Sequence, residues 1–252
     1  MPNTKISRVK RLCNTLLIII IWAALWQIAS MLVEQPLFLP SPYDTFLLLG
    51  QLLITSGFWL SVAFTFYRVA LGIIISFAAG IATAFLAARF SVIEKFLQPF
   101  VAAVKSTPIM SIIILALVWF SSSNVPIFSC ILLCFPIFYT NTLAGIKSVD
   151  VRLLELAAVY KVKRKRVIGE ITIPSVMPHI YSAISVCLGF SWKAVVAAEV
   201  LSSPKFSLGY QLYKTKLSLE TTELFAWTVA IILISLIVEK GLKRLLPKGN
   251  TL

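Results

Sequence analysis

Long apolar stretches separated by short polar segments dominate the pattern of hydrophobic and polar positions along this chain. A helix needs about 20 apolar residues to cross the hydrocarbon core of a bilayer. Most of the stretches reach that length, and the second exceeds it. We therefore predict an all-α polytopic membrane protein with about six transmembrane helices. The expected spans are Asn14–Val33, one within Phe58–Phe90, one within Phe96–Phe120, and about Pro126–Ile146, His179–Val200 and Glu223–Val238.

The composition agrees with a membrane protein. Hydrophobic residues make up 59% of the 252 residues and charged residues only 13%, whereas soluble domains are about half apolar and a quarter charged. The first stretch follows a basic N-terminal segment, as a signal peptide would. Its apolar run is long for a signal and more spans follow, so an uncleaved first span is the favoured interpretation. A single transmembrane domain is expected over residues 1–252, with core spans over about 58–240.

The net charge of +13 would also suit a nucleic-acid-binding protein, but its distribution does not. Lys and Arg cluster in short segments between the apolar runs, which is the positive-inside pattern of membrane proteins. Seventeen of these residues fall on the side of the two termini, and three (Lys205, Lys214 and Lys216) fall on the other. The sequence therefore predicts cytoplasmic N- and C-termini, contact with membrane lipid and no nucleic-acid partner.

Residues that carry chemistry are scarce. There is one histidine, His179, and no Ser/His/Asp set, no paired carboxylates and no glycine-rich phosphate loop. The four cysteines lie in or beside apolar runs without the further ligands that a metal site needs. We expect the cysteines to pack as small apolar side chains, and no catalytic residue, metal or cofactor on this chain. The cysteines are Cys13, Cys130, Cys134 and Cys187.

The polar loop over residues 147–178 is longer and more patterned than a connection requires. Asp150 is a plausible N-cap for a helix over residues 151–160 that gathers leucine and alanine on one face. A basic turn and a second apolar segment follow. We expect Pro174 to end that segment and Pro178 to open the fifth span. Such a loop suits a helix that inserts into the groove of a soluble partner.

This loop resembles the EAA loop of the permease subunits of binding-protein-dependent ABC importers. Glu155 and Ala157 match two of the first three positions of that motif, with Leu156 in place of its first alanine and Ala158 following as another small residue. Lys161 stands where the family has glycine, which is expected to end the first helix in a left-handed turn. The matching end of the motif is formed by Ile171, Ile173 and Pro174. The resemblance implies that this loop couples to an ATPase.

Further similarities to the nitrate, sulfonate and taurine branch of that family run along the chain. They are FLPSP from Phe38, FYRVALG from Phe66, KSTPIM from Lys105, NTLAGIKSVD from Asn141, Ala198-Glu199 and Leu208-Gly209-Tyr210. The resemblance implies a type I importer permease in the bacterial inner membrane, paired with a second, identical chain. It also implies a cytoplasmic ABC ATPase dimer that holds ATP and Mg, an extracytoplasmic solute-binding protein, and a small solute such as nitrate, a sulfonate or taurine as substrate.

Four ionisable residues, Arg68, Lys105, Lys193 and Glu199, fall inside or near predicted spans, with Lys105 expected at the cytoplasmic edge. Charge in the bilayer is costly and marks either a transport pathway or a paired structural site. Both interpretations stay open, and the structural one, in which the cations pair with Glu199 or reach the interface, is favoured. The rival functions are a secondary transporter or channel and a membrane-embedded enzyme. No internal repeat or ion-coupling site supports the first, and no catalytic constellation supports the second.

Overall fold

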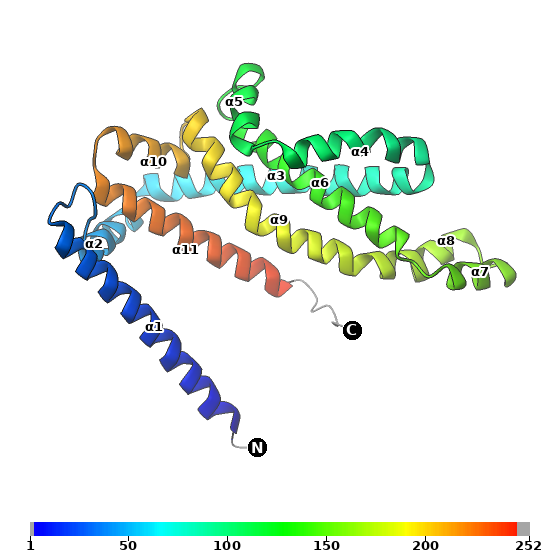
Figure 1. Cartoon of the computed structure of the whole chain (residues 1–252), viewed down its shortest axis with the longest axis horizontal. Coiled ribbons are helices and arrows are strands. Elements are labelled where there is room, and N and C mark those ends of the chain that lie inside the picture. The colour runs from blue at the N-terminus through cyan, green and yellow to red at the C-terminus, as the bar shows by residue number, and fades with distance from the viewer. Residues whose placement is uncertain (1–2, 246–252) are drawn as a thin grey trace. The chain divides into compact units, whose positions relative to one another are not determined.

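The computed structural model describes residues 3–245, without the side chains of residues 3–13, 16, 243 and 245, and every element in it is a helix (Figure 1). This confirms the predicted all-α class. The helices are α1 (Asn3–Val33), α2 (Pro42–Leu53), α3 (Ser56–Arg89), α4 (Ser91–Ser106), α5 (Ile109–Trp119), α6 (Val125–Lys147), α7 (Val151–Val159), α8 (Arg164–Val167), η1 (Ile168–Thr172), α9 (Ile173–Ser202), α10 (Leu208–Leu217) and α11 (Thr221–Leu245).

Four helical segments are long and apolar enough to cross a membrane, and they cover residues 56–89, 125–147, 164–202 and 221–242. A fifth candidate consists of α4 and α5 taken together, and α1 carries a shorter apolar segment over Leu17–Val33. These positions agree with the predicted second, fourth, fifth and sixth spans.

The predicted third span is wrong as a continuous helix, because the chain bends by 107° between α4 and α5. The break falls at Thr107 and Pro108, whose backbones are extended, with ψ of 130° and 132°. A residue that precedes proline is pushed out of the helical region by the proline ring. The Thr107-Pro108 pair therefore divides this apolar run into two helices.

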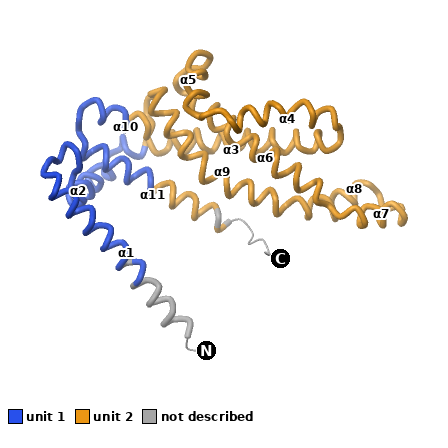
Figure 2. The backbone as a smooth tube through the Cα atoms, in the orientation of Figure 1, with its two compact units in different colours: residues 1–59, 211–232 blue, residues 60–210, 233–252 orange. Residues whose placement is uncertain are grey.

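The chain divides into two compact units (Figure 2), formed by residues 1–59 with 211–232 and by residues 60–210 with 233–252. In the first unit, the Trp26 indole Nε1 donates to the Pro40 carbonyl at 3.1 Å, and its ring lies 5.9 Å from that of Phe225. Phe58 stacks on Trp227 with 5.3 Å between ring centroids. These aromatic contacts join the N-terminal helices of this unit to the start of α11.

In the second unit, α6 packs along α9, and small residues let helices approach closely. A Cβ atom at Gly72 of α3 would lie 2.6 Å from Cβ of Cys130 on α6, and one at Gly80 would lie 2.6 Å from Cβ of Phe138. Both are shorter than any ordinary carbon contact, so only glycine fits there. Cys130, Cys134 and Cys187 are buried with free thiols, whereas the Cys13 side chain lies outside the described residues.

Candidate functional site: the 147–178 loop and the buried charge pair

Helix α7 of the loop begins and ends with well-defined caps. The Asp150 carboxylate accepts a hydrogen bond from the Arg152 N–H at 2.9 Å, as predicted for the N-cap. At the other end, the Val162 N–H donates to the Ala157 carbonyl at 2.9 Å, and the Lys161 N–H donates to the Ala158 carbonyl at 3.0 Å. This pair of bonds is a Schellman motif, which reverses the chain after α7.

Lys161 occupies the left-handed position of this motif, with φ of 52°. The left-handed turn predicted for this position is therefore present with lysine in place of glycine. A residue with a Cβ atom is strained in this conformation by about 1–2 kcal/mol. The strain is local to the turn and leaves the hydrogen bonds of the motif intact.

Replacing Lys161 with glycine is expected to stabilise the folded chain by about 1 kcal/mol, because glycine adopts positive φ without a steric penalty. Thermal unfolding of the detergent-solubilised chain would measure the gain. Lys163→Gly is the matched control, because it removes the same charge two residues away at a φ of −58°, where glycine relieves nothing and costs backbone entropy. Equal effects of the two substitutions would contradict the assignment of strain to Lys161.

The loop continues into the membrane as one helical segment over residues 164–202. Pro174 therefore does not end a helix, and Pro178 lies inside α9 rather than opening it, so both predictions for these prolines are wrong. A π-turn over Ile168–Thr172 precedes Pro174, and the Ile173 N–H donates to the Ile168 carbonyl. Proline lacks the N–H that would hold this turn in the α register, and the wider π backbone accommodates its ring.

Most of the loop surface is exposed. Ala157 is the one buried residue of α7, whereas Glu155, Ala158 and Lys161 are exposed. Ile171 is half-buried, and Ile173 and Pro174 are exposed at the start of α9. The exposed apolar side chains of α7 and its C-cap, all at least 38% accessible, are Val151, Leu153, Leu154, Leu156, Val159 and Tyr160.

Exposed apolar surface of this density marks an interaction site, and its surroundings are basic. A groove of about 270 Å³ runs between α7 and the segment from Arg166 to Ile171. The adjoining turn carries Lys161, Lys163, Lys165 and Arg166 around a second hollow. An amphipathic surface of this kind favours a protein partner with a complementary groove.

The second arrangement is a buried ion pair within the helical core. The Arg68 guanidinium on α3 lies 2.8 Å from Oε1 of Glu199 on α9, and the two side chains are 4% and 0% accessible. The Thr65 hydroxyl lies 3.0 Å from each carboxylate oxygen, and the Gly209 N–H donates to Oε2 at 3.2 Å. The Leu208 N–H in turn donates to Thr65 Oγ1 at 3.0 Å. The pair thus ties α3, α9 and the start of α10 together.

Of the intramembrane charges singled out in the sequence, the structure brings together Arg68 and Glu199 and leaves Lys193 apart. Lys193 is exposed on α9 and forms no ion pair within the described residues. Thr65 and Gly209 complete the site. Gly209 belongs to the Leu208-Gly209-Tyr210 segment, one of those that resemble the importer family. Nothing in the local sequence marks Thr65 as a partner of Glu199.

Together, these features define an integral membrane subunit with an exposed surface for a soluble partner. The chain belongs to the binding-protein-dependent transport system inner membrane component family, which matches residues 76–240. It is therefore a permease subunit of an ABC importer in the inner membrane, and not an enzyme, a secondary transporter or a channel. Homologous permeases work with ATPase and solute-binding partners.

Two of the relatives match over most of this chain and most of their own length. The putative aliphatic sulfonates transport permease protein SsuC of Bacillus subtilis is 29% identical over 81% of this chain and 74% of its own. The taurine transport system permease protein TauC of Escherichia coli is 25% identical over 87% and 82%. Among solved structures, a bacterial ABC transporter that imports the polysaccharide alginate has the same fold, with a TM-score of 0.64 at 18% identity over 97% of this chain and 98% of that one.

Proposed function

We propose that the 147–178 loop couples this permease to a cytoplasmic ABC ATPase dimer. The observation that carries the proposal is α7, a capped helix with one buried residue and an otherwise exposed, largely apolar surface. Glu155 and Ala158 lie on that surface and would contact the ATPase directly. Ala157 is buried and would support the helix from beneath, and the Lys161 turn would fix its direction.

Movement of this loop would reach the membrane through the helical segment over residues 164–202. At about 1.5 Å per residue, its 39 residues span about 58 Å, which is nearly twice the roughly 30 Å hydrocarbon core. Ile171, Ile173 and Pro174 lie where the segment leaves the loop. A push on α7 is thereby transmitted to Glu199 near the far end, which Arg68 anchors to α3.

The complete transporter in this proposal contains two identical permease chains and an extracytoplasmic solute-binding protein. Both termini lie in the cytoplasm, and ATP and Mg bind to the ATPase while this chain holds no cofactor. The transported solute is a small organic or inorganic anion, in line with the sulfonate, taurine and nitrate permeases among its relatives.

The intramembrane charges have separate roles in this proposal. Arg68 and Glu199 have a structural role, and Lys193 is a candidate for the transport pathway.

Replacing Glu155 with arginine is expected to lower the amount of ATPase that co-purifies with the permease at least tenfold. The substitution places a positive charge on the exposed face of α7, beside a turn that is already basic, and so weakens an interface that the glutamate favours. The measurement is the ATPase-to-permease ratio after affinity purification of the co-expressed proteins.

Glu220→Arg is the matched control, because Glu220 is an exposed glutamate before α11, outside the loop, and its substitution should leave that ratio unchanged. An unaltered ratio in Glu155→Arg, with normal uptake, would show that α7 is not the docking helix. Equal losses in both variants would point to a general effect of charge reversal instead.

A further inference from the structure

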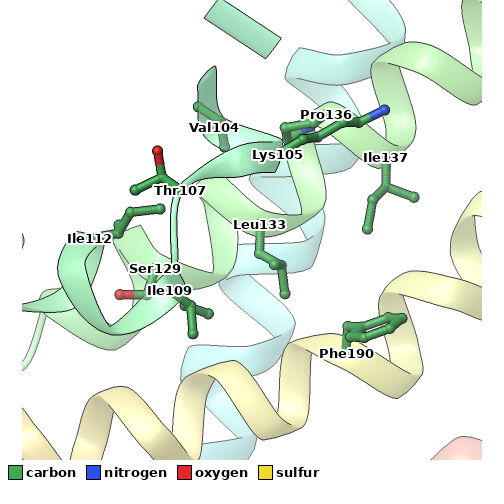
Figure 3. Close-up of a pocket in the computed structure, with 10 residues that line it drawn as sticks. All are labelled: Val104, Lys105, Thr107, Ile109, Ile112, Ser129, Leu133, Pro136, Ile137 and Phe190. Carbon is green, nitrogen blue, oxygen red and sulfur yellow. The ribbon is translucent and has the colours of Figure 1, made fainter. Parts of the chain in front are cut away.

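A cavity of about 280 Å³ lies beside the break between α4 and α5, within the second unit (Figure 3). The end of α4 and the start of α5 form one side of it, and α6 and Phe190 of α9 form the rest. Its walls are mainly apolar. The lining residues are Val104, Lys105, Thr107, Ile109, Ile112, Ser129, Leu133, Pro136, Ile137 and Phe190.

Lys105 is the only charged residue among the ten that line this cavity. Its side chain extends past Pro136 in this view and places the ammonium on the side of Ile137 (Figure 3). The ammonium donates to Thr140 Oγ1 at 3.3 Å. The Thr140 hydroxyl gives its own proton to the Pro136 carbonyl at 2.7 Å, so its oxygen is free to accept from Lys105.

No carboxylate lies within ion-pair distance of Lys105 among the described residues, in contrast to Arg68, which pairs with Glu199. An ammonium has three donors, and Thr140 takes one of them. Cations within membrane-spanning segments are costly unless they are paired or lie at a functional site. Lys105 is exposed, has no carboxylate partner among the described residues, and keeps two donors available at the edge of an apolar cavity.

The break in the helix produces this arrangement. Thr107 and Pro108 end α4 two residues after Lys105, which places the lysine in the last turn of that helix. The same break turns α5 by 107°, and Ile109 and Ile112 at its start then form part of the cavity wall. A straight third span would have provided neither the bend nor this wall.

We infer that this cavity is a transit subsite for a small monoanion with an apolar portion, which Lys105 holds by its charged end. The inference rests on the proposed function and deepens it, because it assigns the anion to particular residues of this chain. At about 30 Å³ per water molecule, the volume equals roughly nine waters, which limits the ligand to a small organic or inorganic ion. The apolar walls favour a short aliphatic or halogenated body over a second charge.

The test uses trifluoromethanesulfonate, a fluorinated monoanion of suitable size, and the permease–ATPase complex purified in a neutral detergent. Binding is measured by the broadening of the ¹⁹F resonance as complex is added. We expect wild type to broaden the signal saturably, Lys105→Met to weaken the affinity at least tenfold, and Lys105→Arg to stay within about threefold of wild type. The uncharged analogue methyl trifluoromethyl sulfone should bind equally to wild type and Lys105→Met.

Lys95→Met is the matched control, because Lys95 is an exposed lysine on the same helix outside the cavity, and it should bind as wild type does. Equal binding by wild type and Lys105→Met would overturn the subsite and show only general attraction to a basic protein. The source of the anion is tested by repeating the titration in nanodiscs. Loss of binding in phosphatidylglycerol but not in phosphatidylcholine would assign the cavity to a lipid headgroup and overturn the proposal.

Failure of the subsite is distinguishable from failure of the proposed function. If the Lys105→Met permease still co-purifies with its ATPase and the wild-type complex binds no trifluoromethanesulfonate, the anion subsite is excluded. The coupling proposal then stands. If no ATPase accompanies the wild-type chain, the coupling proposal itself fails.

Discussion

Replacing Glu199 with alanine is expected to destabilise the folded permease by about 3–5 kcal/mol. The substitution leaves the Arg68 guanidinium buried without its counter-ion, and an uncompensated buried charge carries a cost of this size. It also removes the acceptor of the Thr65 hydroxyl and the Gly209 N–H. Unfolding of the purified chain by SDS in mixed micelles, followed by circular dichroism, would measure the loss.

The double variant Arg68→Met, Glu199→Leu tests the cause. Removing both partners leaves no unpaired charge, so it should cost much less than either single substitution. If the double variant is as unstable as Glu199→Ala, the loss comes from packing and not from an orphaned charge. A change below about 1 kcal/mol in Glu199→Ala would show that the pair contributes little to the fold.

Replacing Gly209 with alanine is expected to cost about 3 kcal/mol or more, at the upper end of the usual penalties for overpacking. A Cβ atom there would lie 2.4 Å from Glu199 Cβ, 2.6 Å from the Val200 nitrogen and 2.7 Å from the Val196 carbonyl oxygen. Two of these contacts are backbone atoms of α9, which a side-chain rotation cannot relieve. The same SDS titration measures the loss, together with the yield of folded protein.

Gly50→Ala provides the control for this substitution. Gly50 lies within α2, and a Cβ atom there meets nothing within 4 Å, so alanine should stabilise the helix by about 0.5–1 kcal/mol. If Gly209→Ala were as harmless as Gly50→Ala, Gly209 would not lie against α9 as the structure has it.

The sequence predicted the class of fold and most of the long helices, because apolar length is a local property that a bilayer imposes directly. It did not predict how prolines act within those helices. Thr107-Pro108 breaks a run that is apolar enough to span, whereas Pro174 and Pro178 lie inside a continuous helix. The difference depends on backbone registers such as the π-turn at Ile168–Thr172, which residue composition does not reveal.

Local features of the 147–178 loop could also be predicted from the sequence, because the Asp150 cap and the left-handed turn at Lys161 depend on neighbours within a few residues. The buried pair was harder to predict. Arg68 and Glu199 are 131 positions apart, and from the sequence alone Lys193 was an equally good partner for Glu199. Only the packing of α3 against α9 decides between the two cations. The cavity at Lys105 depends in the same way on α4, α5, α6 and α9, the last of which is distant in sequence from the other three.

The π-turn before Pro174 also makes chain length a determinant of how α7 is oriented relative to α9. Each residue added to an α-helix rotates everything beyond it by about 100° around the axis, and a π-turn amounts to one such added residue. Loss of a single residue from Ile168–Thr172 would preserve every apolar side chain of α7 yet aim that helix in a different direction from α9. In this segment, the number of residues therefore matters as much as their identity, because it sets the angular phase between the exposed surface of α7 and α9.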